Sequence, residues 1–205
     1  MMLKKLAVLV LMGAVVACVV PASADVAYIS AGDTWKYVNA TTATAASVST
    51  VGFEMPGYDD SSWFTGPAPF GNVSGGDFGN ASGTVWDAFH DPLLRKTIVL
   101  GSPVAMSVDL GVDNGYDFFV NGVHVSGANA EGYTFRWEYS FSIPSSYFVA
   151  GPNVIAVALE DHGGATAFDM QMMGPGSQSV PEPGVVALLI GVGFTGVRFA
   201  LRRRR

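Results

Sequence analysis

An aromatic side chain and several polar side chains lie within one short stretch, at Trp86, Asp87, His90 and Asp91. Carbohydrate-binding sites place an aromatic ring against the apolar face of a pyranose and use nearby polar groups for its hydroxyls. We therefore predict carbohydrate binding at Trp86, Asp87 and His90, with Trp63 as a second aromatic contact. The alternative for each tryptophan is the hydrophobic core, because tryptophan is usually largely buried.

A second group of oxygen-bearing side chains consists of Asp109, Asp113, Asn114 and Asp117. We predict that these residues surround one turn between two strands, where they would supply ligands for a structural Ca²⁺ ion. Such an ion takes about six to eight oxygen ligands. The alternative is that Asp and Asn serve the turn itself, by hydrogen-bonding their own backbone. The spacing is not that of an EF-hand, since the required glycine and the distant glutamate are missing.

Groups that could carry catalysis are few. The chain has three histidines, and the acid and base candidates are residues 160–162 (Glu-Asp-His) together with His90 and Asp91. Ser61 and Ser62 are hydroxyl groups that could act as nucleophiles, but the sequence lacks a nucleophile elbow and a histidine pair at metal-binding spacing. We therefore predict a non-catalytic protein. The alternative is a small extracellular hydrolase with its site in residues 86–91.

These side chains are positioned by an all-β fold. Short β-branched and aromatic runs alternate with Gly, Asn, Asp and Pro clusters from residue 25 to residue 174, which is typical of a sandwich or barrel. The clearest element is a hairpin around Asn121-Gly122, a dipeptide that tolerates the positive φ angles of a type I′ turn. Strands are predicted at residues 34–39, 94–100, 104–110, 116–120, 123–125, 133–143, 153–160 and 167–173.

The predicted domain spans residues 25–173. Residues 153–159 are apolar throughout, apart from Asn153, and indicate a central strand buried on both faces. Residues 40–50, nearly all Ala, Thr and Ser, and residues 71–83, which contain five glycines, are predicted loops. Residues 174–180 form a predicted flexible linker.

Charge and cysteine content exclude several classes of function. The whole chain carries a formal net charge of −6, but residues 25–180 hold four basic against sixteen acidic residues, a formal charge of −12. Such a surface repels a phosphate backbone, so nucleic acid is excluded as a partner. Cys18 is the only cysteine, which excludes disulfide frameworks and zinc fingers.

The N-terminus has the three parts of a secretory signal peptide, covering residues 1–24. Lys4 and Lys5 precede an apolar run over residues 6–20, and Ala22 and Ala24 form an A-x-A cleavage site. We predict that signal peptidase cleaves after Ala24. The alternative is a lipoprotein, because residues 15–18 resemble a loose lipobox that would make Cys18 the acylated first residue.

The C-terminus combines Pro181-Glu182-Pro183, an apolar stretch over residues 185–197 and the arginine cluster Arg202, Arg203, Arg204 and Arg205. This order closely resembles the PEP-CTERM sorting signal of Gram-negative bacteria, and residues 181–205 are assigned to it. The resemblance implies a transmembrane helix that holds the chain in the inner membrane until an exosortase processes it near the Pro-Glu-Pro motif. It also implies a link to exopolysaccharide and biofilms. The alternative is a plain membrane anchor, whose basic end stays cytoplasmic.

The ectodomain sequence resembles galactose-binding-domain-like β-sandwich modules. The resemblance covers about 140 residues and rests on segments 57–63, 66–71, 94–96, 113–115, 119–122, 151–157 and 168–169. It implies a jelly-roll-like antiparallel sandwich. We therefore expect an exported, non-catalytic protein of the cell surface or extracellular matrix that binds exopolysaccharide. A polysaccharide hydrolase and a structural domain without ligand are the alternatives.

Overall fold

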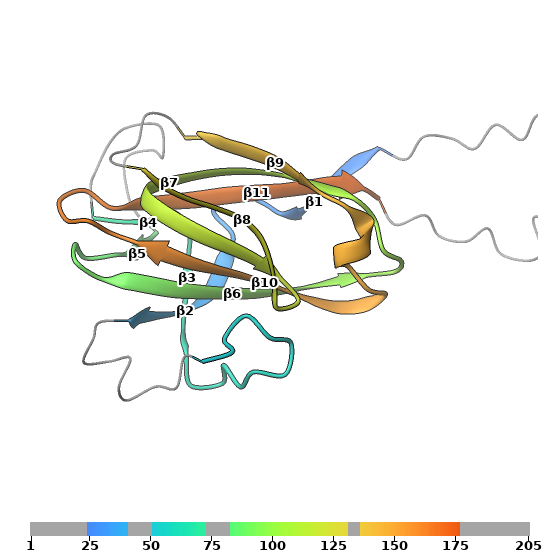
Figure 1. Cartoon of the computed structure of the whole chain (residues 1–205), viewed down its shortest axis with the longest axis horizontal. Helices are drawn as coiled ribbons and strands as arrows, with labels where there is room; N and C mark the ends of the chain where they lie inside the picture. Colours follow the sequence, from blue (N-terminus) through green and yellow to red (C-terminus); the bar gives the residue numbers. More distant parts are fainter. Residues whose placement is uncertain (1–23, 41–50, 73–82, 131–135, 177–205) are drawn as a thin grey trace, which may run out of the picture.

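A computed structural model describes residues 24–40, 51–72, 83–130 and 136–176, which form an all-β sandwich of eleven strands (Figure 1). This confirms the predicted all-β sandwich. Two sheets, here called A and B, share the long strand β7 (Met106–Val120). Sheet A adds β1 (Asp25–Ile29), β4 (Phe70–Gly71), β5 (Thr84–Val85), β9 (Tyr139–Ile143) and β11 (Ala167–Pro175). Sheet B adds β2 (Thr34–Ala40), β3 (Phe64–Pro67), β6 (Asp91–Leu100), β8 (Val123–Ala130) and β10 (Gly151–Glu160). A short 3₁₀ helix, η1 (Ser145–Tyr147), connects β9 to β10.

Strand β7 passes from one sheet to the other. Up to Asp113 it pairs with β11, and from Gly115 onward it pairs with β10. The predicted turn around Asp113 and Asn114 is therefore wrong, and the two strands expected there are one strand of 15 residues. Each half of β7 has a neighbour on both sides, so pairing in an extended conformation satisfies its backbone groups, which outweighs the turn preference of Asp and Asn.

The predicted hairpin is confirmed. Asn121 and Gly122 link β7 to β8 with φ angles of 51° and 85°, both in the left-handed region that a type I′ turn requires. Asn121 also fixes the neighbouring strand, because its Oδ1 accepts the Val154 N–H at 2.9 Å and its Nδ2 donates to Asn153 Oδ1 at 2.8 Å. The turn is thereby tied to the centre of sheet B.

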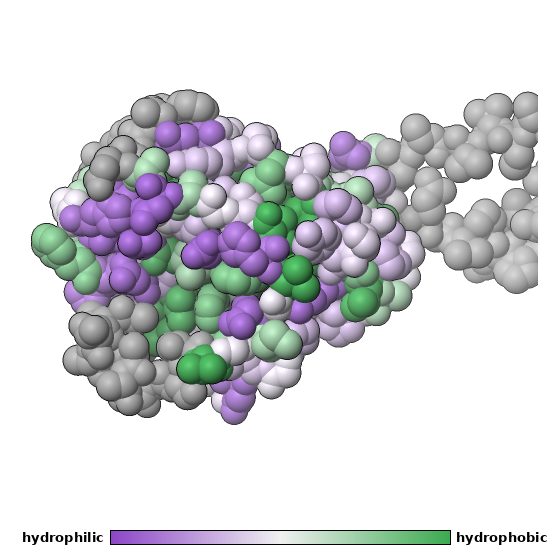
Figure 2. Space-filling model, viewed as in Figure 1, coloured by the Kyte–Doolittle hydropathy of each residue, from purple (hydrophilic) through white to green (hydrophobic). Residues whose placement is uncertain are grey.

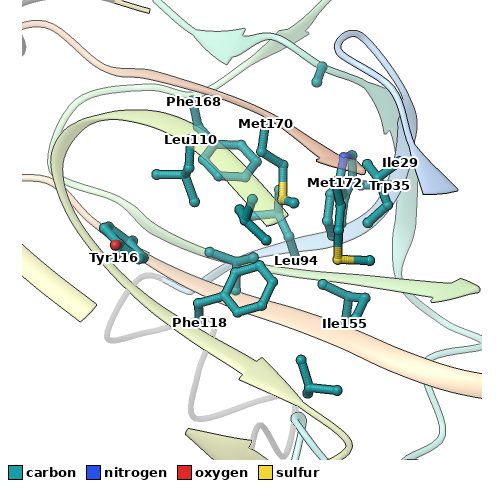
Figure 3. Close-up of a cluster of buried hydrophobic side chains, with 14 of the residues drawn as sticks. Ile29, Trp35, Leu94, Leu110, Tyr116, Phe118, Ile155, Phe168, Met170 and Met172 are labelled. Carbon is teal, nitrogen blue, oxygen red and sulfur yellow. The ribbon is translucent and has the colours of Figure 1, made fainter. Parts of the chain in front are cut away.

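The main core lies between the two sheets (Figure 3). Strand β10 is central in sheet B, between β6 and β7, and the buried stretch from Asn153 to Val157 confirms the strand predicted to be buried on both faces. Inward-facing side chains alternate along each strand, as a sandwich requires. The core includes Ile29, Trp35, Leu94, Leu110, Phe118, Ile155, Phe168, Met170 and Met172.

A second, smaller core lies on the outer face of sheet B. Residues 51–63 cover that face and bury Phe53 and Trp63 against Val38, Val154 and Ala156. Arg95 of β6 holds the segment down. Its Nη1 donates to the carbonyl oxygens of Phe53 and, at 3.2 Å, Met55, and its guanidinium lies 5.2 Å from the Tyr58 ring centre.

Several boundaries differ from the sequence predictions. Strand β11 continues to Pro175, so the predicted domain end at residue 173 and linker start at residue 174 are too early. The strand predicted from residue 133 begins only at Tyr139 in the described chain. Strand β1 was not predicted, although it pairs with β11 along the edge of sheet A.

The two ends of the described chain lie side by side. The Gly176 N–H donates to the Ala24 carbonyl oxygen at 3.1 Å, and Figure 1 shows both ends leaving the sandwich at one end. Apart from Ala24, the predicted signal peptide lies outside the described residues, as do Cys18 and the sorting signal at 181–205. Among the residues that are described, no helix is long and apolar enough to cross a membrane.

Candidate functional site

Two connecting segments meet at the end of the sandwich opposite the chain ends (Figure 1). Residues 86–90 connect β5 to β6, and residues 161–166 connect β10 to β11. They are cross-linked by backbone-to-side-chain bonds: the Asp161 N–H donates to Asp91 Oδ1 at 3.0 Å, and the Thr166 hydroxyl donates to the Trp86 carbonyl oxygen. We call this surface the loop end. It contains the stretch predicted to bind carbohydrate.

Trp86 does not present its ring to a ligand. Its side chain belongs to the main core, it is 0% exposed, and its Nε1–H donates to the His90 carbonyl oxygen at 2.7 Å. The predicted role of Trp86 as a sugar platform is therefore wrong, because the core stabilises the ring more than exposure would. Asp87 is exposed, while His90 is half-buried and its Nδ1 lies 2.9 Å from the Ala88 carbonyl oxygen.

The exposed aromatic ring of the loop end is Phe89, which the sequence prediction missed. Its side chain is 77% exposed, and its backbone has a φ of 63°, a conformation that is uncommon for a residue other than glycine. The backbone is held by the Phe89 N–H, which donates to Asp161 Oδ2. Phe89 is thus a large apolar ring displayed on the surface of the loop end.

Gly163 lies directly beneath the Phe89 ring. A Cβ atom at residue 163 would stand 2.5 Å from Phe89 Cε1, so only glycine leaves room for the ring in this position. The φ of Gly163 is 101°, which glycine also favours. The glycine therefore serves both the turn and the ring, and the ring's position is set by the other loop.

Polar side chains also occur at and beside the connection from β10 to β11. Glu160 Oε1 lies 3.3 Å from His162 Nε2, and Asn129 Nδ2 of β8 donates to Glu160 Oε2 at 3.1 Å. The His162 N–H donates to Asn114 Oδ1 at 2.8 Å, which anchors this segment on β7. Figure 2 shows hydrophilic residues gathered toward this end of the molecule, with apolar residues at its tip. The loop end therefore carries both an exposed aromatic ring and hydrogen-bonding side chains.

Trp63 is also unsuited to the contact predicted for it. The side chain is 6% exposed and packs against Phe53, with ring centres 6.5 Å apart, and against Tyr58, with ring centres 5.6 Å apart. The prediction of Trp63 as a second aromatic contact is wrong, because the ring fills the small core under residues 51–63. It lies on the outer face of sheet B, away from the loop end.

The predicted calcium ligands do not gather around one point. Asp109, Asp113, Asn114 and Asp117 are spread along the single strand β7, where a rise of about 3.3 Å per residue separates Asp109 from Asp113 by about 13 Å. Asp109 accepts from Ser140 and Gln171, and Asp117 Oδ1 lies 2.8 Å from His124 Nε2. Nowhere in the described chain do three or more His, Cys, Asp or Glu side chains come together as metal ligands. The predicted shared site is wrong because its turn does not exist.

The candidate catalytic groups serve mainly as structural links. Asp161 holds the Phe89 N–H, Asp91 holds the Asp161 N–H, and Glu160 accepts from Asn129. Ser61 lies in the segment that covers sheet B, where its N–H donates to Asp59 Oδ1 at 3.0 Å. Asp91 and Asp161 therefore hold the backbone of the loop end in place.

Comparisons with known proteins found similarity only at the level of three-dimensional structure. The chain matches no protein-family model, and no curated protein matches its sequence. Solved structures similar to it include an uncultured Clostridium sp. β-glucuronidase, with a TM-score of 0.48 and 12% identity over 76% of this chain and 29% of that one. A Lactobacillus rhamnosus β-glucuronidase has a TM-score of 0.46 and 13% identity, with the same coverage of 76% and 29%. A glycosyl hydrolase family 2 member from Bacteroides cellulosilyticus DSM 14838 has a TM-score of 0.46 and 17% identity over 73% of this chain and 20% of that one. The chain thus spans less than a third of each of these proteins.

Proposed function

We propose that the protein is an exported, non-catalytic β-sandwich of the cell surface or extracellular matrix, and that its loop end binds polysaccharide. The observation that carries the proposal is Phe89, an aromatic ring that is 77% exposed and held outward by Asp161 and Gly163. Glu160, His162 and Asn129 supply hydrogen-bonding groups on the same surface. A single platform binds weakly, but many copies on a polymer gain from avidity.

The position of the chain ends supports an arrangement in which the loop end points away from a membrane. Both described ends leave the sandwich at the end opposite the connection between β5 and β6, the segment to which Phe89 belongs (Figure 1). A PEP-CTERM helix at residues 185–197 would tether the domain there until an exosortase acts near Pro181-Glu182-Pro183. Signal peptidase cleavage after Ala24 would leave strand β1 complete, because that strand begins at Asp25. The proposed fold family is the jelly-roll-like, galactose-binding-domain-like sandwich.

The non-catalytic part of the proposal is supported by how the acidic groups are used. Asp161 accepts the Phe89 N–H, and Asp91 accepts the Asp161 N–H. Both carboxylates therefore hold the backbone of the loop end in place. The one close acid and base pair at this surface is Glu160 and His162 at 3.3 Å. That pair keeps a polysaccharide hydrolase as the second candidate function.

A polysaccharide pull-down combined with product analysis separates these functions. We expect the full-length protein to bind an insoluble or immobilised exopolysaccharide saturably and to release no oligosaccharides. Release of products that is lost in His162→Ala would instead establish the hydrolase. Failure to bind any polysaccharide, together with the absence of products, would leave a structural domain without ligand and refute the proposal.

A further inference from the structure

An open pocket of about 290 Å³ lies on sheet B, separate from the loop end. Its lining comes from β2, β3, β6 and the covering segment 51–63, and includes Thr34, Lys36, Asp60, Thr65, Arg95 and Thr97. The strand register places Lys36 opposite both Arg95 on β6 and Thr65 on β3. We call it the sheet-B pocket. Its volume is at the small end of the range for ligand sites, about 300–1,000 Å³, and suits one sugar residue.

The sheet-B pocket has the opposite charge to the domain around it. Residues 25–180 carry four basic residues, and three of them, Lys36, Arg95 and Lys96, line this pocket. Asp60 is the acidic residue in the lining, and Lys96 is already paired, because its Nζ lies 3.2 Å from Asp33 Oδ2 and donates to the Thr34 carbonyl oxygen at 2.9 Å. The three basic and two acidic groups leave a formal charge of +1 at the pocket. A cationic pocket on a domain of formal charge −12 attracts an anion at one place and repels it elsewhere.

The geometry of the pocket divides the roles of its charged groups. Arg95 is nearly fully buried: its Nε donates to Asp60 Oδ2 at 2.9 Å, and its Nη1 donates to backbone carbonyls. Lys36 Nζ donates to the Asp60 carbonyl oxygen at 2.9 Å and to Asp60 Oδ1 at 2.8 Å. Since an ammonium has three donors, one N–H of Lys36 is left for a ligand, and its side chain is 40% exposed. Arg95 and Asp60 are therefore positioning residues, and Lys36 is the contact.

The polar lining narrows the class of anion. Thr34, Thr65 and Thr97 are exposed residues on three strands, and their hydroxyls can donate to and accept from sugar hydroxyls. One available ammonium donor suits a carboxylate better than a phosphate, which carries more charge and is usually held by several cations or backbone N–H groups. We propose that the sheet-B pocket binds a carboxylate-bearing sugar residue of an acidic polysaccharide.

This proposal shares the polysaccharide ligand of the proposed function but not its site. A chain bound at both places would gain affinity by multivalency, with the loop end taking uncharged sugars and the sheet-B pocket taking uronates. The two sites lie on different elements, so their contributions can be separated by single substitutions. Failure at the sheet-B pocket would leave binding at the loop end untouched.

Isothermal titration of the full-length protein with three probes tests the proposal. The probes are an oligogalacturonate, a neutral oligosaccharide of the same length and inorganic phosphate. We expect the oligogalacturonate to bind with an affinity that falls as the salt concentration rises. Lys36→Gln should weaken this affinity by about tenfold. Phe89→Ala should retain at least the salt-sensitive part of the binding. Ser142→Glu, on the exposed face of β9, lowers the net charge equally and should leave the affinity unchanged.

Two further measurements keep the result unambiguous. Thermal melting checks that Lys36→Gln is folded. Thr97→Val removes a hydroxyl group from the pocket without changing any charge, and it should weaken the affinity for the oligogalacturonate by about threefold. The proposal is overturned if Lys36→Gln and Ser142→Glu reduce binding equally, or if phosphate binds as tightly as the oligogalacturonate. Binding of the neutral probe alone would overturn it as well, while leaving the loop-end proposal intact.

Discussion

The ion pairs of Asp60 provide a sharp test of how residues 51–63 are held on sheet B. We consider Asp60→Asn, which keeps the shape of the side chain and removes its charge. The carboxylate accepts from Arg95, whose side chain is 4% exposed, and from Lys36, whose side chain is 40% exposed. A charge-assisted bond is roughly twice as strong as a neutral one, about 1.5–3 kcal/mol, so the Arg95 contact loses about 1.5 kcal/mol. The exposed Lys36 pair adds about 0.5 kcal/mol. The substitution should therefore cost about 2 kcal/mol of unfolding free energy at neutral pH.

The same substitution has a defined pH dependence. Burial acts to raise the pKa of Asp60, but the hydrogen bonds from Lys36 and Arg95 outweigh it and hold that pKa below its usual value of 3.8. Because the folded-state pKa is lowered, the stabilisation is present above about pH 4 and is lost as the pH falls through the folded-state pKa. Wild type and Asp60→Asn should thus differ by about 2 kcal/mol at neutral pH and converge toward about pH 2.

Urea unfolding of the full-length proteins, followed by tryptophan fluorescence across this pH range, measures the difference. Asp59→Asn is the matched control, because Asp59 is the exposed neighbouring residue and its main partner is Ser61. We expect only a small change for the control. A difference between wild type and Asp60→Asn that stays constant across the pH range would refute the role assigned to the charge, as would an equal effect of Asp59→Asn.

Three further predictions concern the loop end and the chain ends. In chemical denaturation, Trp86→Ala should lower the unfolding free energy by about 3–5 kcal/mol, because the Trp86 indole is fully buried. Phe89→Ala should change it by less than about 0.5 kcal/mol, because the Phe89 ring is exposed. Gly163→Ala should displace the Phe89 ring and weaken polysaccharide binding in a pull-down assay. Gly164→Ala is the control, because Gly164 has a similar φ of 94° but open space where a Cβ would stand, and it should bind like wild type. Equal losses of binding in the two variants would argue against this role of Gly163. Mass spectrometry of the exported protein should find an N-terminus at Asp25 and a C-terminus near Pro183, and an intact Arg205 in a host with an exosortase would contradict the sorting proposal.

The elements that sequence could predict are those whose signal is local. The Asn121-Gly122 hairpin follows from backbone conformational preference alone, and the strands around residues 34–39, 94–100 and 153–160 follow from runs of β-branched and apolar residues. The turn predicted at Asp113 and Asn114 fails for the converse reason. Pairing partners far away in the sequence keep that backbone extended, and no local pattern reports them.

The sequence predicted a candidate site in residues 86–91 but did not predict which aromatic ring there is exposed. Residues 86–91 do form part of the exposed loop end, yet Trp86 is directed into the core and Phe89 outward. The outward position of Phe89 depends on Asp161 and Gly163, which are more than 70 residues away in the sequence and belong to another loop. The sheet-B pocket was equally hidden, because Lys36, Asp60 and Arg95 meet only through strand register and a covering segment.

The central claim, that the loop end binds polysaccharide through Phe89, is tested most directly by the affinity of Phe89→Ala. Phe64→Ala is the matched control, since Phe64 is a phenylalanine of similar exposure, 66%, on strand β3. Titration of a neutral oligosaccharide into the full-length proteins should show binding weakened by about tenfold or more in Phe89→Ala, because stacking on an aromatic ring contributes about 1.5 kcal/mol. Phe64→Ala should bind like wild type. Unchanged affinity in Phe89→Ala, or an equal loss in both variants, would contradict the account.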